Sequence, residues 1–330
     1  MNTITRLPRL HRRGWLAAAA ALATALALPA TAQTAWPSKP VKILVGFPGG
    51  STPDIAARPL AEALSKLWGQ PVVVENRPGA AGNVAADAAA KSTDDHTLAV
   101  VINGNLTTAK ILNPKLAFDP AKDFAFLSLL NTAPLVLVTP PDQPTGAAWV
   151  AAARAMGDKL SYGSVGIGSV GHLGMEVVKA AVGNSGGVHI PYNGNPAVIT
   201  AMLGGQVQAA LMPPGVALPQ AKAGKVNAVG LAGPRSALAP DVPSLADAGV
   251  KMAPLEVWTA LVGPASLSKA AQERIARDIA TVYKDADLRG KLLTGGWEPQ
   301  GSSPEGLAAR VQSEATLLGD IITARGIKLE

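Results

Sequence analysis

Residues 45–58, with the sequence VGFPGGSTPDIAAR, contain the groups most suited to binding an anion. The apolar run at 41–45 stops at a glycine-rich turn, and a helical pattern begins near Asp54. A strand, a glycine-rich loop and a helix start place several backbone N–H groups around one point, where the helix dipole also favours negative charge. The candidate ligand contacts in this loop are Gly49, Gly50, Ser51, Thr52 and Asp54.

The spacing in this loop argues against three familiar chemistries. A Walker loop needs a Lys followed by Ser or Thr, and a dinucleotide fingerprint needs G-x-G-x-x-G, whereas the glycines here are adjacent. A hydrolase elbow, G-x-S-x-G, fails because Pro53 replaces its last glycine, so Ser51 is a poor nucleophile. The loop is either a ligand cradle or a tight turn in which Thr52 or Asp54 caps the helix. For Asp54 the alternative to capping the helix is to hold an ammonium or hydroxyl group of a ligand.

A second loop repeats the plan. Ser164, Gly166, Gly168 and Ser169 place donors where a helix is expected to begin at Val170. Neither loop contains Lys or Arg, so the donors are neutral. Two helix starts facing each other across a cleft suit a ligand with one or two carboxylates.

Other polar residues give weaker signals. Tyr192 ends an expected strand, where ligand sites of α/β proteins lie, and either stacks on a ligand ring or packs at the rim. The histidines lack the spacing of metal ligands, and there is no cysteine. Glu75 and Arg77 are expected to form a local ion pair. We therefore predict no catalytic residue, metal or cofactor.

Strand and helix patterns alternate along the chain, which predicts an α/β fold with largely parallel sheets. The segments 45–64 and 162–182 share one plan of strand, Gly/Ser loop and helix, which indicates two lobes with a cleft. We expect lobe 1 at 33–135 plus 256–330 and lobe 2 at 136–255, joined by crossover strands. The expected strands are 41–45, 72–75, 98–102, 124–130, 135–138, 160–163, 188–192, 208–212, 226–231 and 258–262, and the expected helices are 55–68, 80–90, 149–156, 170–182, 196–203, 270–284 and 304–324.

The N-terminal 32 residues have the pattern of a cleavable export signal. Four arginines precede an apolar stretch at 15–28, and small residues follow up to Ala32, near the expected cleavage. Arg12 and Arg13 leave a twin-arginine route open, and an uncleaved anchor is the alternative. Without this segment the formal charge falls from 29 − 23 = +6 to 25 − 23 = +2. No basic stripe remains, so we expect no nucleic-acid partner.

Several motifs together resemble the Bug receptor family, the solute-binding proteins of tripartite tricarboxylate transporters. The resemblance runs from about Trp36 to Ile327. The motifs that carry it are WPSKP at 36–40, PVVVENRPGA at 71–80, LSYGS at 160–164 with Gly168, Ser169, His172 and Leu173, PYNG at 191–194, GGQV at 204–207 and PDVP at 240–243.

The resemblance implies a two-lobed periplasmic binding protein of type II-like fold, with two parallel or mixed sheets flanked by helices. Such a receptor closes on a small carboxylated solute and delivers it to membrane permease subunits, and we expect it to be a monomer. The family's carboxylate contacts correspond here to the loop from Phe47 to Asp54, the loop from Ser164 to Ser169, and Asn103.

Two departures from the family pattern bear on the ligand. Gly49-Gly50-Ser51 stands where the family usually has Pro-Gly-Gly, so Ser51 either adds a hydroxyl donor or narrows the pocket. The family often carries an acid near Met212, but here the sequence is LMPP. We keep Met212 as a candidate contact. Without the acid, we hypothesise an uncharged aromatic or aliphatic acid as ligand, and not an amino acid.

Two other functions stay open at this point. One is a secreted α/β hydrolase or transferase with an unrecognised nucleophile, which would need a base near a Ser or Asp. The other is a sensor that presents its closed form to a signalling partner.

Overall fold

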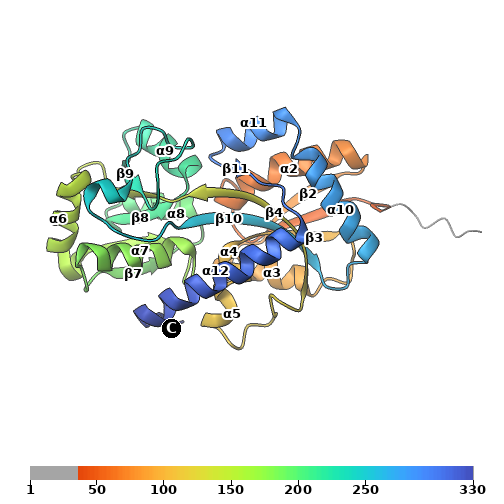
Figure 1. Cartoon of the computed structure of the whole chain (residues 1–330), viewed down its shortest axis with the longest axis horizontal. Coiled ribbons are helices and arrows are strands. Elements are labelled where there is room, and N and C mark those ends of the chain that lie inside the picture. The colour runs from red at the N-terminus through yellow and green to blue at the C-terminus, as the bar shows by residue number, and fades with distance from the viewer. Residues whose placement is uncertain (1–35, 330) are drawn as a thin grey trace, which may run out of the picture. The chain divides into compact units, whose positions relative to one another are not determined.

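The computed structural model describes residues 36–329, and the expected export signal with its cleavage site near Ala32 lies outside them. Residues Lys39–Glu330 form one compact unit that contains every element below. None of the helices in the described part combines the length and the apolar character needed to cross a bilayer. The predicted α/β class with two sheets is confirmed (Figure 1).

The first sheet has the strand order β11-β4-β10-β3-β1-β2. The strands β2, β1 and β3 are parallel, whereas β10 and β4 run antiparallel to their neighbours. Its strands are β1 (Val41–Val45), β2 (Val72–Asn76), β3 (Thr97–Ile102), β4 (Phe124–Pro134), β10 (Glu256–Pro264) and β11 (Glu298–Pro299).

The second sheet repeats this arrangement with the order β7-β6-β8-β5-β9. Its parallel strands are β7, β6 and β8, and β5 pairs antiparallel with both β8 and β9. In both sheets the first strand of the parallel trio lies in the middle, so the chain moves outward in opposite directions from it. Its strands are β5 (Val136–Thr139), β6 (Ser161–Ser164), β7 (Val188–Pro191), β8 (Ala209–Met212) and β9 (Asn227–Leu231).

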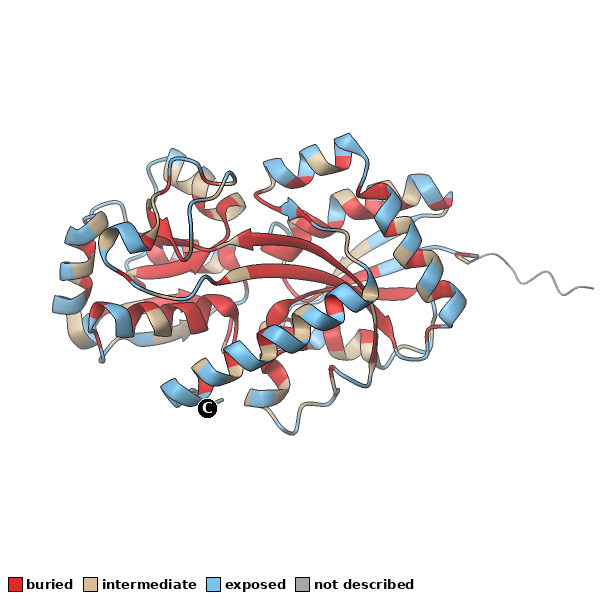
Figure 2. Ribbon diagram, in the orientation of Figure 1, coloured by how far each residue is buried: buried red, intermediate tan, exposed pale blue. Residues whose placement is uncertain are grey.

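Two strands carry the chain between the sheets. β4 leads directly through Leu135 into β5, and the chain returns from the second sheet to β10, which pairs with β4 along nine residues. The two strands lie side by side and are buried along most of their length (Figure 2). The crossovers predicted near 135–138 and 258–262 therefore lie in β5 and β10. The lobe boundaries placed there stay a prediction.

The helices follow the strand-loop-helix rhythm of the sequence. β1-α2-β2-α3-β3 in the first sheet matches β6-α7-β7-α8-β8 in the second. The main helices are α2 (Thr52–Trp68), α3 (Asn83–Ala90), α4 (Asn103–Leu106), α5 (Thr108–Leu112), α6 (Gly146–Met156), α7 (Val170–Val182), α8 (Asn195–Leu203), α9 (Pro214–Lys222), α10 (Lys269–Val282), α11 (Ala286–Thr294) and α12 (Pro304–Arg325), and the short 3₁₀ turns are at 80–82, 157–159 and 245–248.

Two local differences from the expected elements have clear causes. The helix expected at 80–90 starts only at Asn83, because Ala80 and Ala81 have positive φ values of 47° and 54°. The pattern also gives no signal for α11, which begins where the carboxylate of Asp285 accepts the Leu288 N–H at 2.9 Å. A capping residue restarts a helix there without a long apolar stripe.

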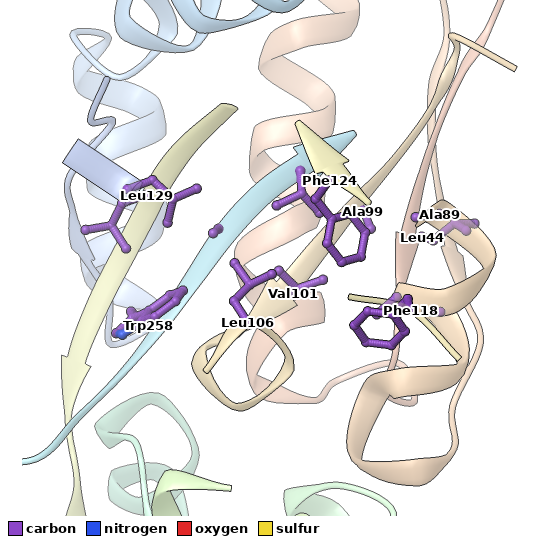
Figure 3. Close-up of a cluster of buried hydrophobic side chains, with 14 residues drawn as sticks. Leu44, Ala89, Ala99, Val101, Leu106, Phe118, Phe124, Leu129 and Trp258 are labelled. Atoms are coloured by element: carbon purple, nitrogen blue, oxygen red, sulfur yellow. The ribbon is translucent and has the colours of Figure 1, made fainter. Parts of the chain in front are cut away.

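The core of the first lobe lies between its sheet and the helices on it. Trp258, Leu129, Phe118 and Phe124 pack there with small residues of α3 such as Ala89 (Figure 3). The rings of Phe118 and Phe124 meet edge to face at 5.5 Å. The alanines allow α3 to lie close to the sheet, which explains the run of small residues at 85–90.

Helix α12 anchors the returning strand β10 through one buried carboxylate. Glu314, 6% exposed, accepts hydrogen bonds from Trp258 Nε1 at 2.6 Å and from Asn103 Nδ2 at 2.7 Å. Arg310 Nε donates to the same carboxylate at 3.0 Å, and its other end reaches Glu256 at 3.1 Å. This network ties α12 to the first residues of β10 and to the end of β3.

Replacing Glu314 by Ala is expected to lower the free energy of unfolding by about 2–4 kcal/mol, because the buried donors of Trp258 and Asn103 and the half-buried Arg310 lose their acceptor. Urea unfolding of wild type and E314A measures the difference. Glu273→Ala, on the exposed face of α10, is the matched control and is expected to change little. Equal stabilities of E314A and E273A would contradict this role for the network.

Candidate functional site

A cavity lies between the two lobes, where the carboxyl ends of β1, β3, β6 and β8 meet. This is the position at which strand order reverses in each sheet, and open α/β sheets bind ligands at that point. Residues from both crossovers, Leu135 and Val257, form part of the wall. The lining comprises Phe47, Ser51, Thr52, Pro53, Ile102, Leu135, Val165, Ser169, Val170, Gly171, Gly194, Asn195, Leu211, Pro213 and Val257.

Four helices begin at this cavity. α2, α7, α8 and α9 each contribute the residue before their first turn to the lining, namely Ser51, Ser169, Gly194 and Pro213. The first N–H groups of a helix have no acceptor within it, and the helix dipole is positive at this end. Four such ends around one space form a site for a negatively charged group.

The cavity provides this environment without a charged side chain. Among the residues that the structure describes, those lining it include no Lys, Arg, His, Asp or Glu. Most of the wall is apolar, and the side-chain donors are Ser51, Thr52, Ser169 and Asn195. An anion in this cavity would meet only neutral N–H and O–H groups of the described lining residues, and binding by the two loops stays a prediction.

Ser51 is the clearest polar group without a partner. It is 1% exposed, and its Oγ atom has no hydrogen-bond partner, although its N–H donates to Pro48 O at 3.1 Å. Ser169 differs, because its Oγ accepts the His172 N–H at 3.3 Å and caps α7. A buried hydroxyl group with no partner lowers the stability of the fold, and it marks a place where a ligand atom can accept a hydrogen bond from it.

The lobes touch each other around the cavity. Asn195 Nδ2 of α8 donates to Thr52 Oγ1 of α2 at 2.5 Å, and Thr108 Oγ1 donates to the carbonyl of Gly168 at 2.8 Å. At Gly215 a Cβ atom would lie 1.9 Å from the carbonyl oxygen of Gly295, so the backbones meet there without side chains. The conformation is therefore closed, and the cavity measures about 30 Å³.

Asp54 lies at this loop but is committed to structure. Its carboxylate accepts the Gly50 N–H at 2.9 Å, two bonds from Arg58 at 2.8 and 2.9 Å, and one from Asn76 Nδ2 at 2.8 Å. Burial alone would raise the pKa of Asp54, but these hydrogen bonds outweigh it and hold the pKa below its ordinary value. Asp54 thus fixes the loop, which supports the structural alternative over a ligand ammonium.

The structure brings some predicted contacts to the cavity and places others behind it. Phe47, Ser51, Thr52 and Ser169 line it. Five others do not line it. Gly49 and Gly50 are exposed, and Gly168 packs on Thr108 and Leu112. Ser164 supports its loop from behind, and Asn103 is bonded to Glu314.

Tyr192 and Met212 also lie outside the cavity. Tyr192 lines a neighbouring groove together with Val165. Met212 is fully buried in the core of the second lobe, while its neighbours Leu211 and Pro213 reach the cavity. Successive side chains of a strand point to opposite faces, so the position next to Met212 faces the ligand side.

Asn195, Gly194 and Pro213 line the cavity although they are not among the contacts predicted from the sequence. Gly194 ends the PYNG motif and Asn195 follows it, whereas Pro213 lies in LMPP, where the sequence departs from the family pattern. No local pattern shows that α8 and α9 also begin at the cavity. A signal was present in Asn-Pro and Pro-Pro, since Pro favours the first turn of a helix.

Two stacked histidines hold the second loop from behind. The rings of His172 and His189 are 3.8 Å apart and nearly parallel, at 14°. His172 Nδ1 accepts the Gly168 N–H at 3.1 Å, and His189 Nε2 lies 2.7 Å from Ser164 Oγ, which in turn bonds Gly166. These two histidines therefore support the loop, and His172 does so by accepting a hydrogen bond from a backbone N–H.

Both histidines favour the neutral form. Burial, with the nearby Lys179 ammonium as a smaller cause, lowers the pKa of His172 to about 4. Burial and the neighbouring His172 ring lower the pKa of His189 to about 3. Protonation of His172 would replace the acceptor of the Gly168 N–H by a second donor and so disturb the loop.

Acidification from pH 7 to pH 4 is expected to destabilise the protein. Below about pH 6.5 the unfolded His172 binds a proton while the folded ring stays neutral to about pH 4, so stability falls as pH falls, by about 3 kcal/mol at most from this residue. His172→Asn keeps an acceptor without titrating and should reduce this slope. Urea unfolding at pH 7, 6, 5 and 4 compares the two proteins. Identical slopes would refute the assignment of this pH dependence to His172. Asp54 affects stability only below this range, because the ordinary pKa of an aspartate is already below pH 4 and that of Asp54 is lower still.

Comparisons with known proteins identify the family and similar folds. The family model described as "Tripartite tricarboxylate transporter family receptor" matches residues 56–327. A Cupriavidus necator protein described as "UPF0065 protein in gbd 5'region" is 35% identical over 285 residues, which cover 84% of this chain and 83% of that protein.

Two ligand-bound structures from Rhodopseudomonas palustris are also similar. MatC with bound malate has a TM-score of 0.80 at 28% identity, over 87% of this chain and 100% of that chain. Rpa4515 with adipate has a TM-score of 0.84 at 27% identity, over 89% of this chain and 99% of that chain. Since the family model covers most of the sequence, the chain belongs to the receptor family of tripartite tricarboxylate transporters, the family that its motifs resemble.

Proposed function

We propose that this protein is an exported receptor that captures a small carboxylate between its two lobes and delivers it to the membrane subunits of a tripartite tricarboxylate-type transporter. The family consists of solute-binding receptors, which favours binding over catalysis. The periplasm is the proposed compartment, with the segment up to Ala32 as the proposed export signal. We propose that the receptor works as a monomer.

The observation that carries this proposal is the meeting of four helix starts at one cavity without a charged side chain among the described lining residues. A carboxylate has up to four lone-pair positions and is satisfied by several neutral donors. The unpartnered Ser51 Oγ supplies one donor in addition to the backbone N–H groups. Bound malate and adipate in two relatives are consistent with such a ligand.

The rest of the lining indicates what the carboxylate is attached to. Ile102, Leu135, Val165, Leu211 and Val257 present apolar surface. A ligand ammonium would find no carboxylate among the described lining residues, and burying it unpaired is unfavourable. We therefore propose an aliphatic or aromatic acid without an amino group as the ligand.

Entry and release require the lobes to separate. A cavity of about 30 Å³ is far below the 300–1,000 Å³ typical of ligand pockets, so a complete ligand does not fit into it while the lobes touch as they do here. We propose that the lobes hinge where the chain crosses between the sheets, next to Leu135 and Glu256. The Thr52–Asn195 hydrogen bond would then break on opening and re-form when the ligand is enclosed.

A calorimetric panel of mono- and dicarboxylates, with aspartate and glutamate included, tests this function directly. Mass spectrometry of whatever co-purifies with the protein guides the choice of acids. We expect simple acids to bind and the amino acids to bind weakly or not at all. A protein that binds no acid, or that selects aspartate or glutamate over simple acids, would refute the proposal.

Replacing Ser51 by Ala is expected to weaken binding of the best acid in the panel. A hydrogen bond to a charged group contributes about 1.5–3 kcal/mol, so the loss should be about 10- to 100-fold in Kd. Ser185→Ala, at an exposed position of the second lobe, is the matched control. If S51A binds like S185A, the hydroxyl group does not face the ligand.

A further inference from the structure

A groove adjoins the cavity on the far side of Val165. It measures about 590 Å³, and among the described residues its wall comes from both lobes and contains no charged side chain. Apolar groups dominate the wall, with Tyr192 and the amides of three asparagines between them. Its lining includes Ala81, Leu112, Val165, Ile167, Tyr192 and Ala197.

Val165 is a common wall of the two spaces. It lies in the second loop, between β6 and α7, and it lines both the cavity and the groove. Its side chain is only partly buried. The cavity with four helix starts and the uncharged groove are therefore neighbours separated by one valine.

The small volume of the cavity limits how much of a ligand it can hold. A space of about 30 Å³ has room for about two or three water-sized groups, which matches a carboxylate group but not a complete organic acid. In the closed conformation the remainder of a longer acid must lie somewhere else. The groove on the other side of Val165 adjoins the cavity, measures about 590 Å³ and offers apolar contact.

The groove is held in shape by an unusual turn. Ala80 and Ala81 adopt positive φ values, a conformation that side-chain-bearing residues rarely take. Asn105 Nδ2 fixes this turn by donating to the carbonyl of Ala81 at 3.0 Å and to Asn83 Oδ1 at 2.9 Å. A Cβ atom on Gly166 would lie 2.6 Å from the Ala81 Cβ, so the two lobes meet closely here and the groove has this shape only when they are closed.

Resting on the proposed function, we infer that the groove is a subsite for the uncharged tail of the acid, and that Val165 determines how readily the tail enters it. The carboxylate binds at the helix starts, and the aliphatic or aromatic remainder passes Val165 and lies between Ala81 of one lobe and Tyr192 and Ala197 of the other. Tail binding then joins the two lobes and favours the closed form.

A series of straight-chain monocarboxylates from propionate to octanoate tests this subsite by calorimetry. Each methylene buried contributes about 0.8 kcal/mol, or about fourfold in Kd, so affinity should rise stepwise once the chain reaches the groove. Ala197→Phe fills the groove from the side opposite Val165 and should remove most of this rise. Val165→Phe thickens the common wall and should do the same.

Ala151→Phe, an equally large change at an exposed position of α6 outside both linings, is the matched control and should keep the rise. Unfolding midpoints confirm that each variant is folded, and a result from either groove variant suffices. Affinity independent of chain length in the wild type, or an unchanged rise in both A197F and V165F, would overturn the subsite while leaving the receptor function intact. Failure of every acid to bind would instead overturn the proposed function and the subsite with it.

Discussion

The structure depends on one constraint, which is that the first N–H groups of a helix need acceptors from outside the helix. Four helices begin at the same cavity, and their starts lie close together because both sheets reverse their strand order there. The loops after β1 and β6 are short and glycine-containing, so the backbone itself faces the space. In the proposed function, the negative oxygens of a ligand accept hydrogen bonds from these N–H groups.

Both lobes have the same arrangement of strands and helices, so each supplies one half of the cavity. Each lobe has a parallel trio with its first strand in the middle, and each places the loop after that strand at the interface. The antiparallel pair β4 and β10 connects the two lobes, and the chain passes between the two sheets twice. Backbone contact at Gly215 and side-chain contact at Thr52 then define the closed arrangement.

The sequence was informative where local pattern and chemistry coincide. The two glycine-containing loops that precede α2 and α7, the alternation of strands and helices, and the internal resemblance of the two halves could be predicted, because glycine spacing and apolar runs encode them directly. The role of Asp54 could not, since Asn76, which shares its carboxylate, lies 22 residues away on another strand. The same holds for Asn195 and Pro213, whose helices reach the cavity only through tertiary packing. Met212 and Leu211 differ by one position on a strand, and only the observed register decides which of them faces inward.

The neutral lining has a consequence for the conditions under which the site works. Dissolved salt weakens attraction between fixed ions, with a screening length of about 8 Å at physiological ionic strength, but it has little effect on short hydrogen bonds from enclosed backbone groups. A carboxylate enclosed in this cavity would therefore be screened less by dissolved salt than one held by exposed lysines or arginines.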